Sequence, residues 1–193
     1  YYLGVVLKAQ GRFDAARNEL ERAVWSAAWQ PAGYHALAEI ACMRGDFARA
    51  LDLVERSLAR NSSNARALSL RSAVLRRLDR LDEAYQNVLA TAAVDPLDFR
   101  AANELCLALA AVGERAQAAE AAERLGAWMR GEPQSYLELA VEYGNAGLYE
   151  EACGVLERAA AAAGGEDKVH PMVYYFLGWY SAAQGKKAEA ADF

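Results

Sequence analysis

The sequence predicts an all-α fold built from repeated helix–turn–helix units. Alanine is abundant, whereas the 193 residues include only 14 glycines and 4 prolines, and alanine is the strongest helix former. One six-residue phrase also recurs: a glycine-like residue, any residue, usually an aromatic or leucine, two further residues and alanine. Apolar or small residues at helical spacing flank this phrase on both sides. The pattern therefore predicts pairs of helices joined by tight turns.

The copies of the phrase keep a fixed distance along the chain. They begin at Gly11, Gly45, Asp79, Gly113, Gly147 and Gly185. The first five follow each other in steps of 34 residues, and the sixth comes after a step of 38. The additional residues fall in the segment 164–168, whose two glycines indicate a loop. Five copies in one register do not arise by chance, so the chain is an internal repeat array.

Each turn is expected to join a first helix, here named helix A, to a second, helix B. In helix A, residues such as Tyr34, Ala38 and Ala41 recur at i, i+4 and i+7, which places them on one helix face. The middle position of this stripe is small in every copy. The first turn of helix B has an alanine at the same position of each copy, the last residue of the six-residue phrase. Two small residues at a helix crossing allow the axes to approach closely. The turn glycine is expected to take φ > 0 and close helix A.

Prolines support the same phase. Pro31, Pro133 and Pro171 each fall at the predicted first position of a helix A, where the missing N–H carries no penalty. Trp25 and Trp29 are expected to close the first helix B. These positions divide the chain into repeats at about 1–30, 31–64, 65–98, 99–132 and 133–170, with a partial sixth at 171–193.

The 34-residue period, the small crossing residues and the turn glycines resemble the tetratricopeptide repeat family over essentially the whole chain, 1–193. The resemblance implies a right-handed α-solenoid with five repeats in register and a partial sixth, whose concave wall is lined by helices A. Three positions depart from the family pattern: Asp79 replaces a turn glycine, Arg115 an aromatic residue, and Arg71 a residue that is often leucine. Each repeat is stabilised mainly by its neighbours, so these departures leave the interpretation intact.

The resemblance also predicts which side chains line a peptide-binding concave face. They include His35, Glu39, Arg66, Ser69, Arg76, Arg77, Arg100, Asn103, Tyr175 and Trp179. Four arginines lie in the middle of this set although the chain is acidic. Because guanidinium groups suit carboxylates and phosphates, one hypothesis is that they receive an acidic or C-terminal segment of a protein partner. The alternative is that they solvate exposed helix faces and pair with nearby Asp and Glu. The two-carboxylate clamp of chaperone co-receptors has no match at the corresponding positions.

Aromatic residues are concentrated towards both ends of the sequence. Tyr174, Tyr175, Phe176, Trp179 and Tyr180 gather in the partial last repeat, and Tyr1 and Tyr2 open the chain. Aromatics at helical spacing are more often packing residues than ligand contacts. Repeat arrays need polar capping helices, and this sequence shows none. We therefore expect that the chain is part of a longer protein, or that it self-associates through its uncapped ends.

Composition and motifs exclude several classes of function. A net charge of −5 is wrong for a general nucleic-acid binder, and no apolar stretch reaches the ~20 residues of a membrane helix. The two histidines lie in different repeats, and the three cysteines match no metal spacing. No catalytic triad, phosphate loop or HExxH is present, so we predict a protein that is not an enzyme and needs no metal or cofactor. Cysteine usage fits a cytoplasmic protein, and the dominance of arginine among basic residues a bacterial one.

Two functions remain. The first is a non-catalytic scaffold that binds a peptide or protein segment in the concave groove formed by helices A. The alternative is an intramolecular or dimerising repeat arm, appended to a catalytic or carbohydrate-handling domain of a larger bacterial protein. A large neighbouring domain that covers the Tyr174–Trp179 patch would favour the alternative.

Overall fold

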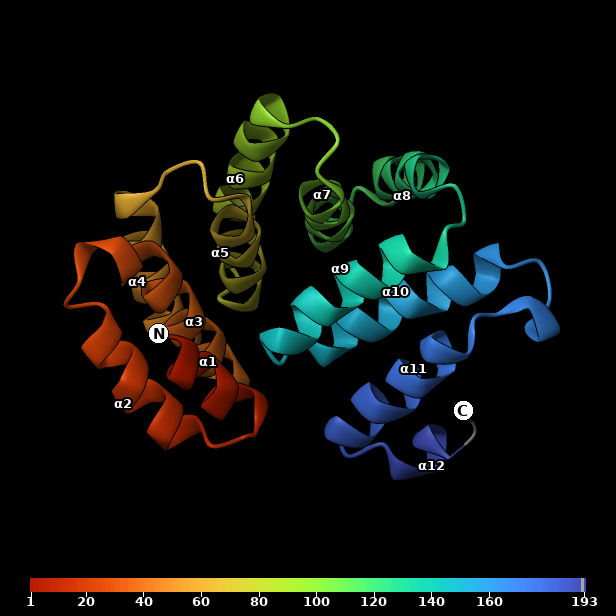
Figure 1. Ribbon diagram of the computed structural model, residues 1–193. Coiled ribbons are helices and arrows are strands. Elements are labelled where there is room, and N and C mark those ends of the chain that lie inside the picture. Colours follow the sequence, from red (N-terminus) through yellow and green to blue (C-terminus); the bar gives the residue numbers. More distant parts are fainter. Residues whose placement is uncertain (192) are drawn as a thin grey trace. The chain divides into compact units, whose positions relative to one another are not determined.

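The computed structural model describes residues 1–191 and 193, and in this part of the chain all regular structure is helical (Figure 1). The helices are α1 (Tyr2–Ala9), α2 (Phe13–Ala23), η1 (Ala27–Trp29), α3 (Gln30–Met43), α4 (Phe47–Arg60), α5 (Ala65–Arg77), α6 (Leu81–Val94), α7 (Phe99–Ala111), α8 (Arg115–Met129), α9 (Pro133–Asn145), α10 (Tyr149–Ala162), η2 (Glu166–Lys168), α11 (Pro171–Ala183) and α12 (Lys187–Ala190). Successive α-helices form pairs, α1/α2 to α11/α12, and the first member of each is helix A. This confirms the predicted all-α repeat architecture.

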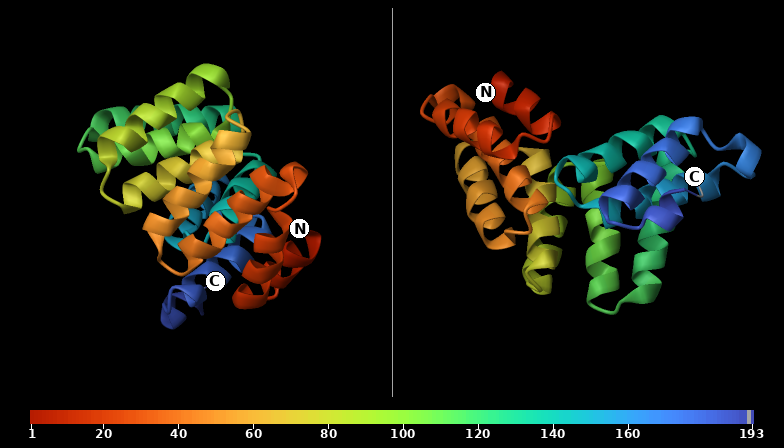
Figure 2. Two further views of the ribbon diagram at one scale, coloured as in Figure 1. Left: turned by 90° about the vertical axis from the view of Figure 1, so that its left-hand side faces the viewer. Right: turned by 90° about the horizontal axis from the view of Figure 1, so that it is seen from below.

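The chain divides into two compact units within α8, Tyr1–Ala122 and Glu123–Phe193, named unit 1 and unit 2 here. The sequence predicts one array over 1–193. In unit 1, the pairs α1/α2, α3/α4 and α5/α6 follow one another, and each helix B also contacts the helix A of the next pair (Figures 1 and 2). In unit 2, α10 contacts both α9 and α11, and α9 and α11 also contact each other.

The turns between helices A and B share one backbone geometry. The glycines that open the six-residue phrase have φ between 71° and 89°. At the end of α3, the N–H of Gly45 donates to the Cys42 carbonyl over 2.9 Å, and the N–H of Asp46 donates to the Ala41 carbonyl over 3.0 Å. These two bonds define a Schellman motif. The prediction that the turn glycine closes helix A with positive φ is therefore confirmed.

Asp79 takes the same conformation without being glycine. Its φ is 58°, its N–H donates to the Arg76 carbonyl, and the Arg80 N–H donates to the Leu75 carbonyl. Aspartate is among the few non-glycine residues that enter this region at moderate cost. The third turn is thus built like the others, and its departure from glycine is absorbed as local strain.

Small residues permit the close crossing of paired helices, as the sequence predicts. A β-carbon at Gly4 in α1 would lie 2.6 Å from Cγ of Leu20 and 3.2 Å from the Ala16 carbonyl oxygen in α2. The phrase alanines Ala16, Ala50, Ala84 and Ala152 have no exposed surface. In the fourth pair, Ala118 of α8 packs against the buried cluster that contains Cys106 of α7. These contacts fix the helix pairs that carry the surface side chains.

A buried polar network fills the crossing of α5 and α6. The Asn87 amide donates to the Leu68 carbonyl over 2.9 Å and to the Ser72 hydroxyl over 2.6 Å, while its oxygen accepts from Arg71 over 2.9 Å. Arg71 also lies 3.5 Å from Glu55. Arg71 replaces a residue that is often leucine in the family because here its guanidinium satisfies Asn87, which is only 7% exposed.

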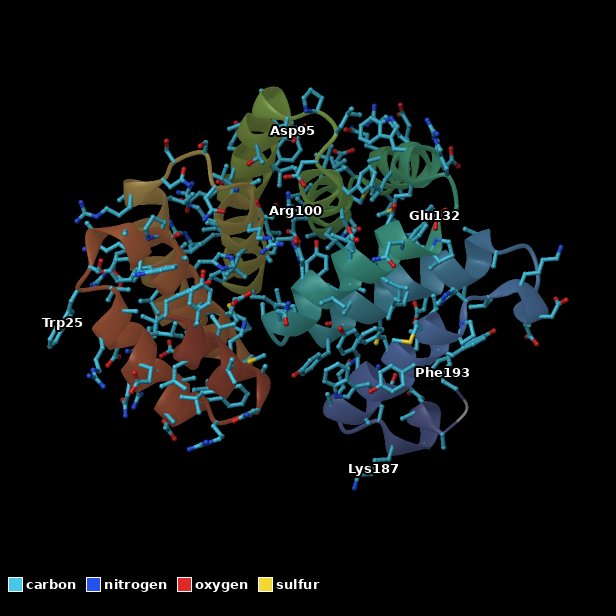
Figure 3. The ribbon with its side chains drawn as sticks, in the orientation of Figure 1. Trp25, Asp95, Arg100, Glu132, Lys187 and Phe193 are labelled. Atoms are coloured by element: carbon cyan, nitrogen blue, oxygen red, sulfur yellow. The ribbon has the colours of Figure 1, made fainter. Side chains whose placement is uncertain are left out.

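The end of the first helix B differs from the expectation. α2 ends at Ala23, so Trp25 and Trp29 do not close it; Trp29 belongs to the separate short helix η1. Ser26, in an extended conformation, breaks the helix, and the Trp29 ring instead stacks on Tyr1 with centroids 5.0 Å apart. Trp25 is 85% exposed and projects from the surface (Figure 3). Pro31 is the second residue of α3, one position later than predicted, whereas Pro133 and Pro171 begin α9 and α11.

Within the described residues, none of the helices is both long enough and apolar enough to cross a membrane.

Candidate functional site

The first two helices A, α1 and α3, meet through polar side chains in unit 1. Lys8 of α1 donates to Glu39 of α3 over 2.5 Å, and Nδ1 of His35 lies 3.9 Å from the same carboxylate. The side chains of Lys8 and Glu39 are largely shielded, with 9% and 14% of their surface exposed. The pKa of the Tyr1 phenol is raised, first by burial and then by Glu39, while Arg66 of α5 lowers it. His35 and Glu39 therefore lie together, and Arg66 is near enough to Tyr1 to influence its phenol.

A second cross-repeat contact joins α5 to α7. Arg76 donates to the two carboxylate oxygens of Glu104 from Nε over 3.0 Å and from a terminal nitrogen over 3.3 Å. The Glu104 side chain is fully buried and that of Arg76 is 12% exposed. A buried carboxylate is stable only with a well-placed partner, so Arg76 neutralises Glu104 in the folded chain.

Arg100 is also paired, with an acid on its own helix. Asp98 caps the N-terminus of α7: it accepts from the Arg100 backbone N–H and from Arg100 Nε, both over 2.9 Å. The Asp98 side chain is 1% exposed, and Asn103, one turn further along, is buried as well. Figure 3 labels Arg100, which lies at the start of α7. Its guanidinium is thus held at the helix terminus.

Two of the predicted arginines lie at the surface of α5. Arg66 and Arg77, near its two ends, are exposed. Between them, the Ser69 hydroxyl is shielded from solvent and has no hydrogen-bond partner. Arg66 and Arg77 are therefore the accessible arginines of α5, whereas the Ser69 hydroxyl lies beneath the surface.

In unit 2 the predicted residues are aromatic. Tyr175 and Trp179 of α11 are 62% and 55% exposed. They belong to an array of rings in which Phe176 contacts both, and Trp179 stacks on Tyr180 with centroids 5.4 Å apart. Tyr180 is 2% exposed, and this burial raises the pKa of its phenol far above the ordinary value. The exposed Trp179 ring is thus packed against the buried Tyr180 ring.

The predicted residues are divided between the two units, and Asn103 is 1% exposed, so the prediction that its side chain lines an open face is wrong. His35, Glu39, Arg66, Ser69, Arg76, Arg77, Arg100 and Asn103 belong to unit 1, and Tyr175 and Trp179 to unit 2. Sequence reasoning missed Lys8, Asp98 and Glu104, which neutralise predicted residues. A signal existed for two of them: Lys8 precedes Glu39 by 31 residues and Arg76 precedes Glu104 by 28, nearly one repeat in each case.

Metal-ligating side chains are scattered in the described part of the chain. Among the residues described, no three His, Cys, Asp or Glu side chains are grouped so that they could hold a metal ion. Cys42, Cys106 and Cys153 are buried and unbridged. Burial raises the pKa of the Cys153 thiol, although hydrogen bonds from Ser181 and Gln184 oppose that shift. The arrangement is suited to contact with another molecule.

The fold defines a class, the helical-repeat proteins, and comparison with known proteins shows which members of that class the chain resembles. The family model described as tetratricopeptide repeat matches residues 1–22 and 31–56, which contain α1 and α3 and most of α2 and α4. Solved structures extend the similarity. A tetratricopeptide repeat protein from Parabacteroides merdae superposes with a TM-score of 0.66 at 20% identity, over 98% of this chain and 73% of that one.

Two further structures cover more of their own length. A thermophilic TPR protein of Thermus thermophilus has a TM-score of 0.64 at 24% identity, over 95% of this chain and 96% of that one. PilF of Pseudomonas aeruginosa has a TM-score of 0.63 at 23% identity, over 99% and 85%. At these identities the likeness shows the fold. The matched segments and the turn that recurs in every pair agree with a fold built from helix pairs of the tetratricopeptide repeat type.

Proposed function

We propose that the chain is a non-catalytic scaffold that binds a peptide or protein segment on the exposed side chains of its helices A. The observation that carries this proposal is the direct contact between helices A of different repeats in unit 1, through Lys8–Glu39 and Arg76–Glu104. These pairs fix α1 against α3 and α5 against α7. They therefore support a preorganised surface made by several helices, which lowers the entropic cost of binding an extended segment.

The hypothesis that arginines bind an acidic or C-terminal segment now concerns mainly the arginines of α5. Arg76 and Arg100 hold Glu104 and Asp98, and unit 1 as a whole contains 15 basic and 15 acidic residues. Arg66 and Arg77 are the predicted arginines that are exposed. If an acidic or C-terminal segment binds unit 1, we propose that it contacts α5 at these two side chains.

The test must change exposed charges only. Reversal of Arg76 would place two carboxylates together beside a buried site, so lost binding would then report unfolding. The informative variant is Arg66→Glu with Arg77→Glu. Its matched control is Arg60→Glu with Arg124→Glu, because both of these residues are exposed on helices B and the change in net charge is the same.

The assay is affinity capture from a lysate of the source organism, followed by direct titration with the purified partner. We expect the helix-A variant to lose the partner and the helix-B variant to keep it, with both retaining wild-type circular dichroism. Equal binding by the two variants would locate the interaction elsewhere and refute this use of helices A.

A further inference from the structure

The charge of the chain is divided unequally between its units. Unit 1 is balanced, with 15 basic and 15 acidic residues, whereas unit 2 contains six basic and eleven acidic residues. The whole net charge of −5 therefore belongs to unit 2. A segment that docks on unit 2 meets a negative potential, which attracts cations and repels anions.

The same unit presents an apolar stripe along one helix. Met172, Tyr175 and Trp179 of α11 follow each other at i, i+3 and i+7, and are 40%, 62% and 55% exposed. Phe176 lies in the same stripe and is half-buried. Residues at this spacing share a helix face, so the stripe is one continuous surface of large side chains. Exposed apolar surface of this kind marks an interaction site.

The rings of this stripe are held in place from below. Trp179 stacks on the buried Tyr180 ring, which also lies 5.6 Å from Phe176 and 5.6 Å from Tyr149, measured between centroids. Tyr175 contacts Phe176 edge to face over 5.4 Å. A supported aromatic surface loses little side-chain entropy on binding, as in other interaction hot spots. Its faces also attract a Lys or Arg cation placed within about 6 Å of a ring centroid.

Carboxylates lie on two segments that contact α11, the helix α9 and the loop 164–168, whose two acids exceed its one base, Lys168. Glu138 of α9, the helix A that contacts α11, is exposed and accepts a hydrogen bond from the neutral amide of Gln134 over 2.8 Å. This bond leaves its negative charge in place. On the other side, Tyr174 donates to the Glu166 backbone carbonyl over 3.4 Å. That bond holds the loop with the exposed Glu166 and Asp167 against α11.

From these observations we infer that the α11 face of unit 2 binds a basic, apolar protein segment, with its Arg or Lys side chains over Tyr175 and Trp179 and its apolar side chains between them. The inference rests on the proposed scaffold function and adds the ligand chemistry for these two residues. It is opposite in charge to the segment expected at Arg66 and Arg77 of unit 1. The two sites therefore differ in which peptides and which substitutions affect them.

The experiment is a fluorescence-anisotropy titration of the full chain with short, capped, labelled peptides. The probe contains arginine, leucine and serine; matched peptides carry glutamine or glutamate in place of arginine. We expect the arginine peptide to bind most tightly, with an affinity that falls as salt rises, and the glutamate peptide to bind at least about tenfold more weakly. Equal binding of arginine and glutamine peptides would overturn the cationic part of the inference.

Substitutions locate the site. Trp179→Ala is expected to weaken binding of the arginine peptide by about 10- to 30-fold, as for a hot-spot aromatic, whereas Trp179→Phe retains most of it. Glu138→Gln should flatten the salt dependence. The control is Trp25→Ala, because Trp25 is an exposed tryptophan of unit 1. An equal effect of Trp25→Ala and Trp179→Ala would overturn the placement on α11.

Two other results separate this inference from the proposed function. A chain that binds the glutamate peptide through Arg66 and Arg77 but not the arginine peptide would retain the scaffold function and overturn the inference. A chain that self-associates through Trp179, as measured by sedimentation, and binds no peptide there would overturn it as well. Loss of all peptide and protein binding would refute both.

Discussion

The crossing of α9 and α11 allows the packing argument to be tested with two matched glycine substitutions in unit 2. Gly144, near the end of α9, faces the ring of Tyr180. A β-carbon at this position would lie 2.6 Å from Cζ and 2.7 Å from Cε1, and would also collide with the hydroxyl. Gly154, within α10, has no heavy atom within 4 Å of the position that its β-carbon would occupy. Replacing each glycine by alanine therefore changes the same atoms in two different environments.

The magnitudes follow from these distances. Ordinary carbon–carbon contact is about 3.5–4.0 Å, so Gly144→Ala requires the Tyr180 ring to move by about 1 Å. The ring is 2% exposed and stacks against Tyr149, Phe176 and Trp179, so overpacking costs about 1–3 kcal/mol. The gain from replacing a helical glycine by alanine is about 0.5–1 kcal/mol. We expect Gly144→Ala to destabilise by about 0.5–2 kcal/mol and Gly154→Ala to stabilise by about 0.5–1 kcal/mol.

The assay is urea unfolding followed by circular dichroism and by tryptophan fluorescence. Both probes are needed because repeat arrays can unfold in parts. The midpoint should fall for Gly144→Ala and rise for Gly154→Ala. If Gly144→Ala raises the midpoint as much as Gly154→Ala, then the Tyr180 ring is not fixed against α9. The Tyr180 ring would then not hold the rings of Phe176 and Trp179 in fixed positions.

Three further predictions concern unit 1. Asp79→Gly should stabilise by about 0.5–1 kcal/mol because it removes a positive-φ strain, and Asp79→Ala should destabilise, as measured by urea midpoints. Asn87→Ala should cost about 1–3 kcal/mol by the same assay, since Ser72 and Arg71 lose their partner, while the exposed Gln117→Ala stays within about 0.5 kcal/mol. The hydrogen bond and charge of Arg44 lower the pKa of Asp14, so carboxyl NMR titration should place it below 3.8 and Arg44→Ala should raise it. Because the folded pKa is the lower one, this stabilisation is present above about pH 4 and is lost as pH falls through the depressed value; an unchanged titration in Arg44→Ala would contradict the pairing.

The fold is largely readable from the sequence because its determinants are local and repeated. The turn glycines indicate a backbone conformation that few other residues adopt. The alanines, such as Ala16, indicate where two helices cross. Because six turns follow the same pattern, a wrong prediction at one position does not change the predicted position of the other helices. The end of α2 was wrongly predicted because Trp25 and Trp29 have helical spacing in sequence, whereas Trp29 is held by stacking on Tyr1, a contact distant in the chain.

The candidate site is less predictable, because its charges depend on partners from other helices. From sequence, Arg66, Arg76, Arg77 and Arg100 are alike, but in the structure Arg76 pairs with the buried Glu104 and Arg100 with the buried Asp98. Helical periodicity indicates which face a residue occupies and leaves open whether its charge is neutralised there. Spacings of nearly one repeat, such as Lys8–Glu39 and Arg76–Glu104, are the sequence signal that can indicate neutralisation.

Neutralisation also determines what each unit can recognise. In unit 1 the acidic and basic residues are equal in number, so we propose that recognition there depends on individual exposed groups such as Arg66. In unit 2 the acids exceed the bases, and α11 adds rings in place of charges. One repeat pattern therefore produces two surfaces of different chemistry, because the helix-crossing positions keep small residues while the exposed helix-A positions vary without disturbing the fold. The ligands of such a chain are accordingly to be sought separately for each unit, with peptides of opposite charge.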